Sequence, residues 1–90
     1  RMESTSQINN LDVYPNPSRD IFNIRFVSEK IQDLSIRVIN IMGELVYEEK
    51  ANQFIGEYTK QIDLTDNSKG VYFLEITTNK GVVNRKIVIQ

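Results

Sequence analysis

Histidine and cysteine, the residues that most often serve as a base, a nucleophile or a metal ligand, are both absent from this chain of 90 residues. Nucleophilic catalysis needs an activated nucleophile beside a base, and no Ser-x-x-Lys spacing stands on a predicted helix to replace the missing pair. The absence of cysteine also removes any disulfide or thiolate metal site. We therefore expect no catalytic residue, no cofactor and no metal ligand set, and we do not expect the chain to be an enzyme.

Carboxylates are the remaining groups that could act on a ligand. The segment Asp63-Leu64-Thr65-Asp66-Asn67 offers oxygen ligands of the kind that calcium prefers, but it lacks the acidic spacing and the closing glutamate of an EF-hand loop. We interpret it as a solvated turn, with a weak calcium site as the alternative. A glycosidase would need two carboxylates across a cleft, and a small β-domain has little room for one. The glycines stand far apart, at predicted strand boundaries, so they form no phosphate-binding loop.

Length and charge place the chain among small single domains. A chain of 90 residues buries about 60–65% of its unfolded surface, which is enough to fold alone. The formal net charge is −1 with scattered basic residues, which argues against a nucleic-acid partner. No apolar run approaches the ~20 residues of a membrane-spanning helix. Residues 1–10 are polar and carry no signal peptide, so we expect an export leader to belong to a longer parent chain.

Apolar and polar residues alternate along most of the chain, which is the pattern of half-buried β-strands. The predicted strands are 11–14, 20–27, 34–41, 44–50 and 58–64, with two more in a terminal hairpin within 69–90. We expect connections at 28–33 and 51–57, the second tucked onto the core by Phe54 and Ile55. The predicted core residues are Phe22, Ile24, Phe26, Leu34, Ile36, Val38, Tyr58, Ile62, Leu64, Tyr72, Leu74, Ile76, Ile87 and Ile89.

This strand count, without a convincing helix, predicts an all-β fold. The expected architecture is an immunoglobulin-like or fibronectin-like β-sandwich of about seven antiparallel strands over residues 11–90. Residues 1–10 are expected to be a flexible lead-in. In the terminal hairpin the break is Asn79-Lys80-Gly81, where glycine adopts positive φ without steric cost. Pro15 and Pro17, the only prolines, end the first strand.

Several pieces of the sequence carry a family resemblance when they are taken in order. They are Val13-Tyr14-Pro15-Asn16-Pro17-Ser18, then Ile36-Arg37-Val38-Ile39-Asn40-Ile41-Met42-Gly43-Glu44-Leu45-Val46, then Lys69-Gly70-Val71-Tyr72-Phe73-Leu74-Glu75-Ile76, and finally Lys86-Ile87-Val88-Ile89-Gln90. Together they resemble the C-terminal sorting domain of the type IX secretion system (the Por secretion tail) of Bacteroidota, over about residues 11–90. By this resemblance the motif residues are Pro15, Asn16, Pro17, Gly43, Gly70, Val71, Tyr72, Lys86, Ile87, Val88, Ile89 and Gln90.

The resemblance implies a non-catalytic module that ends a larger exported protein, its parent. Such a module passes through the periplasm with the parent and directs it through an outer-membrane translocon to the cell surface or the medium. The implied partners are the translocon, the N-terminal parent protein and a sortase-like peptidase. In the family that peptidase commonly removes the domain and joins the parent to anionic lipopolysaccharide. Cleavage would fall in or near the lead-in before Leu11.

The terminal strand suggests how a receptor could bind. If it lies at a sheet edge, its unpaired N–H and C=O groups can accept an added strand, and its carboxylate end is offered with them. We expect Arg85 and Lys86 to supply charge contacts while Ile87 and Ile89 hold the strand to the core. Deletion of residues 86–90 is then expected to abolish export without unfolding the rest.

Two other functions fit the same composition. One is an accessory β-sandwich that serves as a binding or spacer module on a surface or secreted enzyme. Such a module would be expected to carry an exposed aromatic or acidic cluster, and the sequence shows neither. The other is a self-associating adhesive domain, which rests only on Ile39, Val71 and Phe73 as exposed apolar residues.

Overall fold

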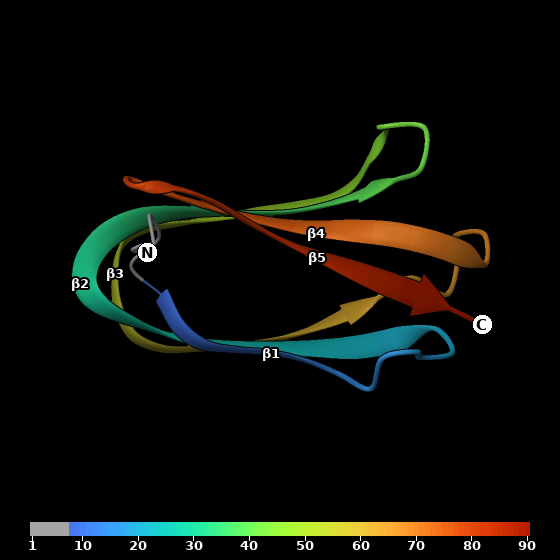
Figure 1. Cartoon of the computed structure of the whole chain (residues 1–90), viewed down its shortest axis with the longest axis horizontal. Helices are drawn as coiled ribbons and strands as arrows, with labels where there is room; N and C mark the ends of the chain where they lie inside the picture. Colours follow the sequence, from blue (N-terminus) through green and yellow to red (C-terminus); the bar gives the residue numbers. More distant parts are fainter. Residues whose placement is uncertain (1–7) are drawn as a thin grey trace, which may run out of the picture.

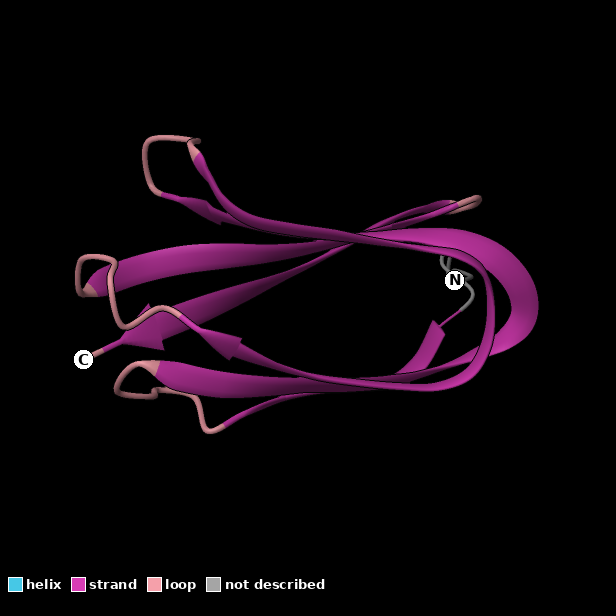
Figure 2. Ribbon diagram, turned by 180° about the vertical axis from the view of Figure 1, so that it is seen from behind, coloured by secondary structure: helices cyan, strands magenta, loops and turns pink. Residues whose placement is uncertain are grey.

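The structure, a computed structural model, describes residues 8–90 and consists of five antiparallel β-strands. The strands are β1 (Ile8–Tyr14), β2 (Ile21–Asn40), β3 (Leu45–Asp63), β4 (Gly70–Thr78) and β5 (Gly81–Ile89). They form one sheet in the order β1-β2-β4-β5, with β3 also paired to β2 (Figures 1 and 2). No helix occurs in this described part of the chain, so the all-β prediction is confirmed.

The two longest strands each replace two predicted strands and the connection between them. β2 and β3 pair along almost their whole length as one hairpin, with register shifts between Ser28 and Leu34 where both strands bend. The predicted connections at 28–33 and 51–57 are therefore wrong, and the number of strands is five and not seven. Polar residues gave these segments the composition of loops. The backbone pairing nevertheless runs through the bend, where Gly56 has φ +103° and Gln53 has φ +51°.

The bend folds the sheet back on itself. The first half of β2 lies between β1 and β3, whereas its second half lies between β3 and β4. The two parts of the curled sheet face each other across the core in Figure 1, and β5 extends the second part. A single continuous sheet thus stands where two separate sheets of a sandwich were predicted.

The buried face follows the predicted alternation. The predicted core residues are all buried, and Ile8 joins them. Tyr58 stacks on Phe26 with ring centroids 4.8 Å apart, and Phe54 meets Tyr58 edge-on at 5.6 Å. Phe54 packs against the core as expected, but Ile55 is 56% exposed and does not.

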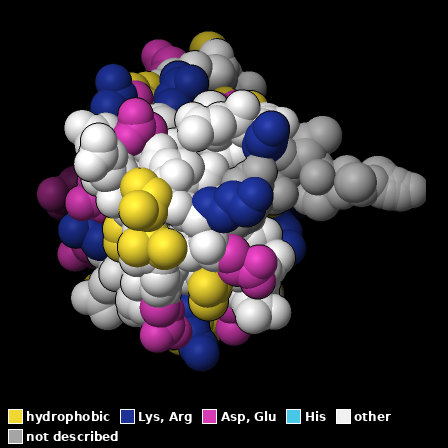
Figure 3. Space-filling model, turned by 90° about the vertical axis from the view of Figure 1, so that its left-hand side faces the viewer, with side chains coloured by type: hydrophobic (Ala, Val, Ile, Leu, Met, Phe, Trp, Pro, Cys, Tyr) yellow, Lys and Arg dark blue, Asp and Glu magenta, His cyan; other side chains and the backbone are white. Residues whose placement is uncertain are grey.

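Buried polar groups support the bend. Ser28 and Gln32 are both buried; Ser28 Oγ donates to the carbonyl of Lys30 at 2.8 Å, and Gln32 Nε2 donates to Ser28 Oγ at 2.9 Å. On the paired strand, the amide of Gln53 donates to an Asp33 carboxylate oxygen at 2.8 Å. These bonds give partners to the hydroxyl of Ser28, the side-chain nitrogen of Gln32 and the amide of Gln53. Figure 3 looks onto this end of the molecule, where a few hydrophobic side chains reach the surface among charged ones.

The ends of the strands are close to those expected. β1 begins at Ile8, three residues before the predicted boundary at Leu11, because Ile8 is 8% exposed and packs into the core. The rest of the predicted lead-in, residues 1–7, lies outside the described residues. Thr78 pairs with Gly81 across a two-residue turn at the end of the terminal hairpin. No helix in the part described is long and apolar enough to cross a membrane.

Candidate functional site

The predicted motif residues, far apart in the sequence, lie together at one end of the molecule. Register places Gly70 opposite Ile89, Val71 opposite Val88 and Tyr72 opposite Ile87. The turn that contains Gly43 follows β2, whose last residue pairs with Tyr72. The loop with both prolines joins β1 to β2, and it lies at the same right-hand end of Figure 1, beside the C-terminus. We call this end the motif end.

A backbone clamp connects the first motif to the last. Asn16 Nδ2 donates to the carbonyl of Lys86 at 2.9 Å, and Asn16 Oδ1 accepts from the amide of Val88 at 3.1 Å. The amide of Ser18 donates to the carbonyl of Val88 at 2.9 Å, and the amide of Gln90 donates to the carbonyl of Ser18 at 2.7 Å. The amide group of Asn16 thus imitates one residue of a neighbouring strand. These four bonds, from Asn16 and Ser18, are called the clamp below.

The clamp changes which part of β5 is open. β5 is the last strand in the sheet order, as the edge hypothesis requires, but the clamp already occupies its outer edge from Lys86 to Gln90. Ile87 and Ile89 are 0% and 2% exposed, so they do hold the strand to the core. Deleting residues 86–90 would remove two buried side chains and part of a strand, so we expect it to damage folding, contrary to the expectation from the sequence.

A surface hollow at the motif end joins the two middle motifs. Its volume is about 510 Å³, and its lining comes from the turn after β2, the loop before β4 and the start of β4. Ile41 and Met42 are 72% and 78% exposed, so they give the hollow an apolar rim. Val71 contributes from β4, while Glu44 and Asp66 add acidic groups. The hollow can therefore accept an apolar side chain from a partner protein.

The turn that carries this rim is held by Asn40. Asn40 Oδ1 accepts from the amides of Met42 and Glu44, both at 2.9 Å, and Asn40 Nδ2 donates to Glu44 Oε1 at 2.8 Å. Gly43 has φ +82°, a conformation that side chains disfavour, and no atom lies within 4 Å of the place where a Cβ would stand. The glycine of the middle motif is thus required by backbone conformation and not by packing.

The comparisons with known proteins identify the family of this chain. The family model described as a secretion system C-terminal sorting domain matches residues 12–90, which includes every motif residue at this end. The chain belongs to the family of type IX C-terminal sorting domains. Such a domain is a sorting signal of secreted proteins, and the recognition predicted from the sequence is confirmed.

A curated relative supports the assignment. The chain is 34% identical over 87 residues to a protein named ulvan lyase NLR42 from Nonlabens ulvanivorans. The match covers 94% of this chain but only 15% of that relative, so the sorting domain corresponds to a small part of a much longer protein. The expected link to Bacteroidota fits this relative.

Two residues outside the predicted site help to build the motif end of the sorting domain. Asp20, which follows the first motif, binds Lys69 Nζ, and its carbonyl accepts from the amide of Leu64 at 2.8 Å. Asn40 holds the turn of the middle motif. Sequence reasoning missed both, although an asparagine three residues before a glycine is a recognisable turn signal. The contact between Asp20 and Lys69 could not be predicted from the sequence, because no local pattern links the two residues.

The electrostatics of the sorting domain differ between the β3 edge and the β5 edge. At the β3 edge, burial and the bond to Glu49 raise the pKa of Tyr58, and the same two causes raise the pKa of Tyr47. At the motif end, β5 carries Arg85 and Lys86 and no acidic residue. Hydrogen bonds from the hydroxyl and the amide of Thr65 lower the pKa of Asp63. Residues 8–90 contain no group of three side chains that could hold a metal ion.

Proposed function

We propose that this sorting domain, itself without catalytic activity, directs its parent protein from the periplasm through an outer-membrane translocon to the cell surface or the medium. The observation that carries the proposal is the gathering of all family motifs at one end of the fold. Motif residues that served only folding would be expected along the whole core. Here Tyr72, Ile87 and Ile89 belong to the core, but the motifs as a set lie around one end of β5 and a hollow with an apolar rim.

The motif end offers a partner two kinds of contact. Next to this end, the part of the β5 outer edge that the clamp leaves open supplies backbone groups for strand addition, with Arg85 and Lys86 as the charges that accompany it. The hollow rimmed by Ile41 and Met42 supplies apolar contact on the β2 side of β4. This combination of a hydrogen-bonding edge and an apolar pocket favours recognition of a folded domain over recognition of an unfolded peptide.

A sortase-like peptidase then removes the domain or the domain serves in surface attachment. β1 begins at Ile8, and a peptidase needs extended backbone that it can seize, so we place cleavage before Ile8. The mass of the C-terminal fragment that is released during export tests this placement. A fragment that begins within β1 would contradict it.

An export assay tests the main proposal. A fluorescent protein directed to the periplasm would be fused to residues 1–90 and expressed in two otherwise identical hosts, one of which lacks the outer-membrane translocon of the type IX system. We expect fluorescence at the surface or in the medium only where the translocon is present. The same fluorescent protein without the domain should stay in the periplasm of both hosts. Retention of the folded fusion in both hosts would favour the accessory binding module instead.

A further inference from the structure

The outer edge of β5 is divided into an occupied and an open part. In an antiparallel pair, alternate residues turn their N–H and C=O groups toward the neighbouring strand and away from it. The clamp bonds identify the outward set, because they use groups of Lys86, Val88 and Gln90. By the same alternation, the backbone groups of Val82 and Asn84 and the amide of Lys86 also point away from β4.

No strand of the described chain occupies this second part. β5 pairs with β4 alone, and the clamp reaches no further along it than the carbonyl of Lys86. Val82 is 50% exposed, and Asn84 and Lys86 are exposed as well. A strand edge of this kind is a template for pairing with another chain. We call the segment Val82–Lys86 the open edge.

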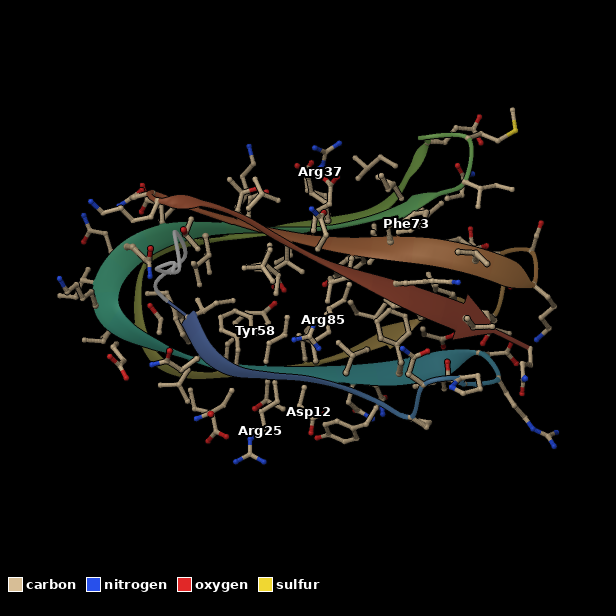
Figure 4. All side chains as sticks on the ribbon, viewed as in Figure 1. Asp12, Arg25, Arg37, Tyr58, Phe73 and Arg85 are labelled. Atoms are coloured by element: carbon tan, nitrogen blue, oxygen red, sulfur yellow. The ribbon has the colours of Figure 1, made fainter. Side chains whose placement is uncertain are left out.

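The open edge is cationic. Arg85 lies opposite Leu74, which is fully buried, so its side chain starts on the core face of β5 although it is exposed. Figure 4 shows Arg85 on the inner side of β5, toward the part of the sheet that contains β1. Lys86 projects from the opposite face, and within residues 8–90 neither side chain takes part in an ion pair. Positive charge therefore stands on both faces of the strand at this place.

This charge distinguishes among possible occupants. Two copies of the domain that paired through their β5 edges would bring four cationic side chains together, which disfavours self-association. An extended segment with acidic side chains would instead place carboxylates beside Arg85 and Lys86 while its backbone pairs with the open edge.

We propose that Val82–Lys86 is the docking edge for an extended acidic segment of a partner protein, which adds to β5 as a further strand. The inference rests on the proposed function, because the partner is a component of the export machinery. It moves the point of recognition away from the last residues, whose edge the clamp has already filled.

The test is a pair of substitutions at one position, carried in the fluorescent fusion. Asn84→Pro removes an amide hydrogen that points outward and that no group of residues 8–90 uses, and proline is tolerated at such edge positions. Asn84→Thr keeps the amide and replaces only the side chain, so it is the matched control. Circular dichroism and thermal unfolding of both purified domains establish that each is folded.

We expect export of Asn84→Pro to fall by about tenfold or more, because a partner strand loses net hydrogen bonds and meets the proline ring. Asn84→Thr, which keeps the outward amide, should be exported far better than Asn84→Pro. Export of a folded Asn84→Pro domain at the unchanged level would overturn the inference and leave the proposed function intact. Retention of the unchanged fusion would overturn both.

A second variant decides the matter if Asn84→Pro does not fold. Arg85→Glu combined with Lys86→Glu leaves every backbone group in place and reverses the charge of the open edge. An acidic partner would then be repelled, so export should fall while the domain remains folded. Export at the unchanged level would exclude an acidic segment at this edge.

Discussion

The curled sheet has outer edges at β1, β3 and β5, and those at β3 and β5 are closed by different means. β3 pairs only with β2 among the described strands. Side chains from its two halves nevertheless contact each other across the core. Glu49 comes from one part of the sheet, and Lys60 and Tyr58 come from the other. Lys60 Nζ lies 3.8 Å from Glu49 Oε2, and the Tyr58 hydroxyl donates a hydrogen bond to Glu49 Oε1. Figure 4 shows Tyr58 between the two parts.

The β5 edge has no comparable network of side chains. A loop some 70 residues away in the sequence closes its last part through the amide of Asn16 and the backbone of Ser18. Both edges carry charged residues on the core face, which is a known protection against unwanted pairing. At β3 the inward charges Glu49 and Lys60 neutralise each other, whereas Arg85 at β5 finds no partner in residues 8–90. Within residues 8–90, β3 is thus closed by its own side chains, whereas part of the β5 edge stays open.

The largest effect is expected from removing the aromatic group at the β3 edge. Tyr58→Ala deletes a buried ring that stacks on Phe26 and leaves a cavity at the bend. The free energy of unfolding should fall by about 3–5 kcal/mol, as measured by urea denaturation. Tyr47→Ala is the matched control, because Tyr47 also binds Glu49, at 3.3 Å, but is only partly buried. Equal losses for the two variants would contradict the role given to the stacked ring.

An intermediate effect is expected at the clamp. Asn16→Ala removes both side-chain bonds to β5, so stability should fall by about 1–2 kcal/mol. Hydrogen exchange at the amide of Val88 should accelerate more than exchange in the core of β4, because the loss is local. Asn16→Asp keeps the acceptor for Val88 and should protect this amide better than alanine does.

The control for the clamp is a second asparagine near the same loop. Asn23 Nδ2 donates to the carbonyl of Tyr14 at 3.2 Å and makes no bond to β5, so Asn23→Ala should leave exchange at Val88 unchanged. If Asn16→Ala also left it unchanged, the clamp would not hold the terminal strand, and the division of the β5 edge would have no basis.

Local pattern in the sequence predicted the faces of the strands but not their continuity. Alternation identified the buried positions from Phe22 to Ile89, because a half-buried strand repeats every two residues wherever it lies. The bends were not predicted, since Ser28 and Gln32 have the polarity of loop residues. In the structure they are buried and hydrogen-bonded to each other. The same limit applies to the site. The motifs could be named from the sequence, but the pairing of Asn16 with Lys86 and Val88 depends on topology that no local pattern carries.

The smallest effect expected at neutral pH comes from the hydroxyl of Tyr58. It distinguishes the two edges because the stability it contributes at the β3 edge should depend on pH. Burial and the bond to Glu49 raise the pKa of Tyr58 above its ordinary value of 10.0, so the folded domain keeps this proton at pH values where the unfolded chain has lost it. The contribution of the protonated Tyr58 to the free energy of unfolding is fully present below about pH 10. Above that pH the free energy of unfolding falls, by up to about 1.4 kcal/mol for each pH unit. The clamp contains only amide and backbone groups, which do not titrate in this range, so the β5 edge should not share the decline.

Tyr58→Phe tests this sign without removing the stacked ring. The variant should be about 1 kcal/mol less stable at pH 7, because a buried hydrogen bond is lost. Its stability should then fall less steeply than that of the unchanged domain above pH 10, so that the difference between the two shrinks or reverses. Urea denaturation at several pH values from 7 to 11.5 measures both slopes, and Tyr14→Phe, at an exposed tyrosine, should follow the unchanged domain. Parallel slopes for Tyr58→Phe and the unchanged domain would show that the hydroxyl of Tyr58 titrates as it does in water. In that case Glu49 would no longer account for the closure of the β3 edge, and the contrast with β5 would rest on the clamp alone.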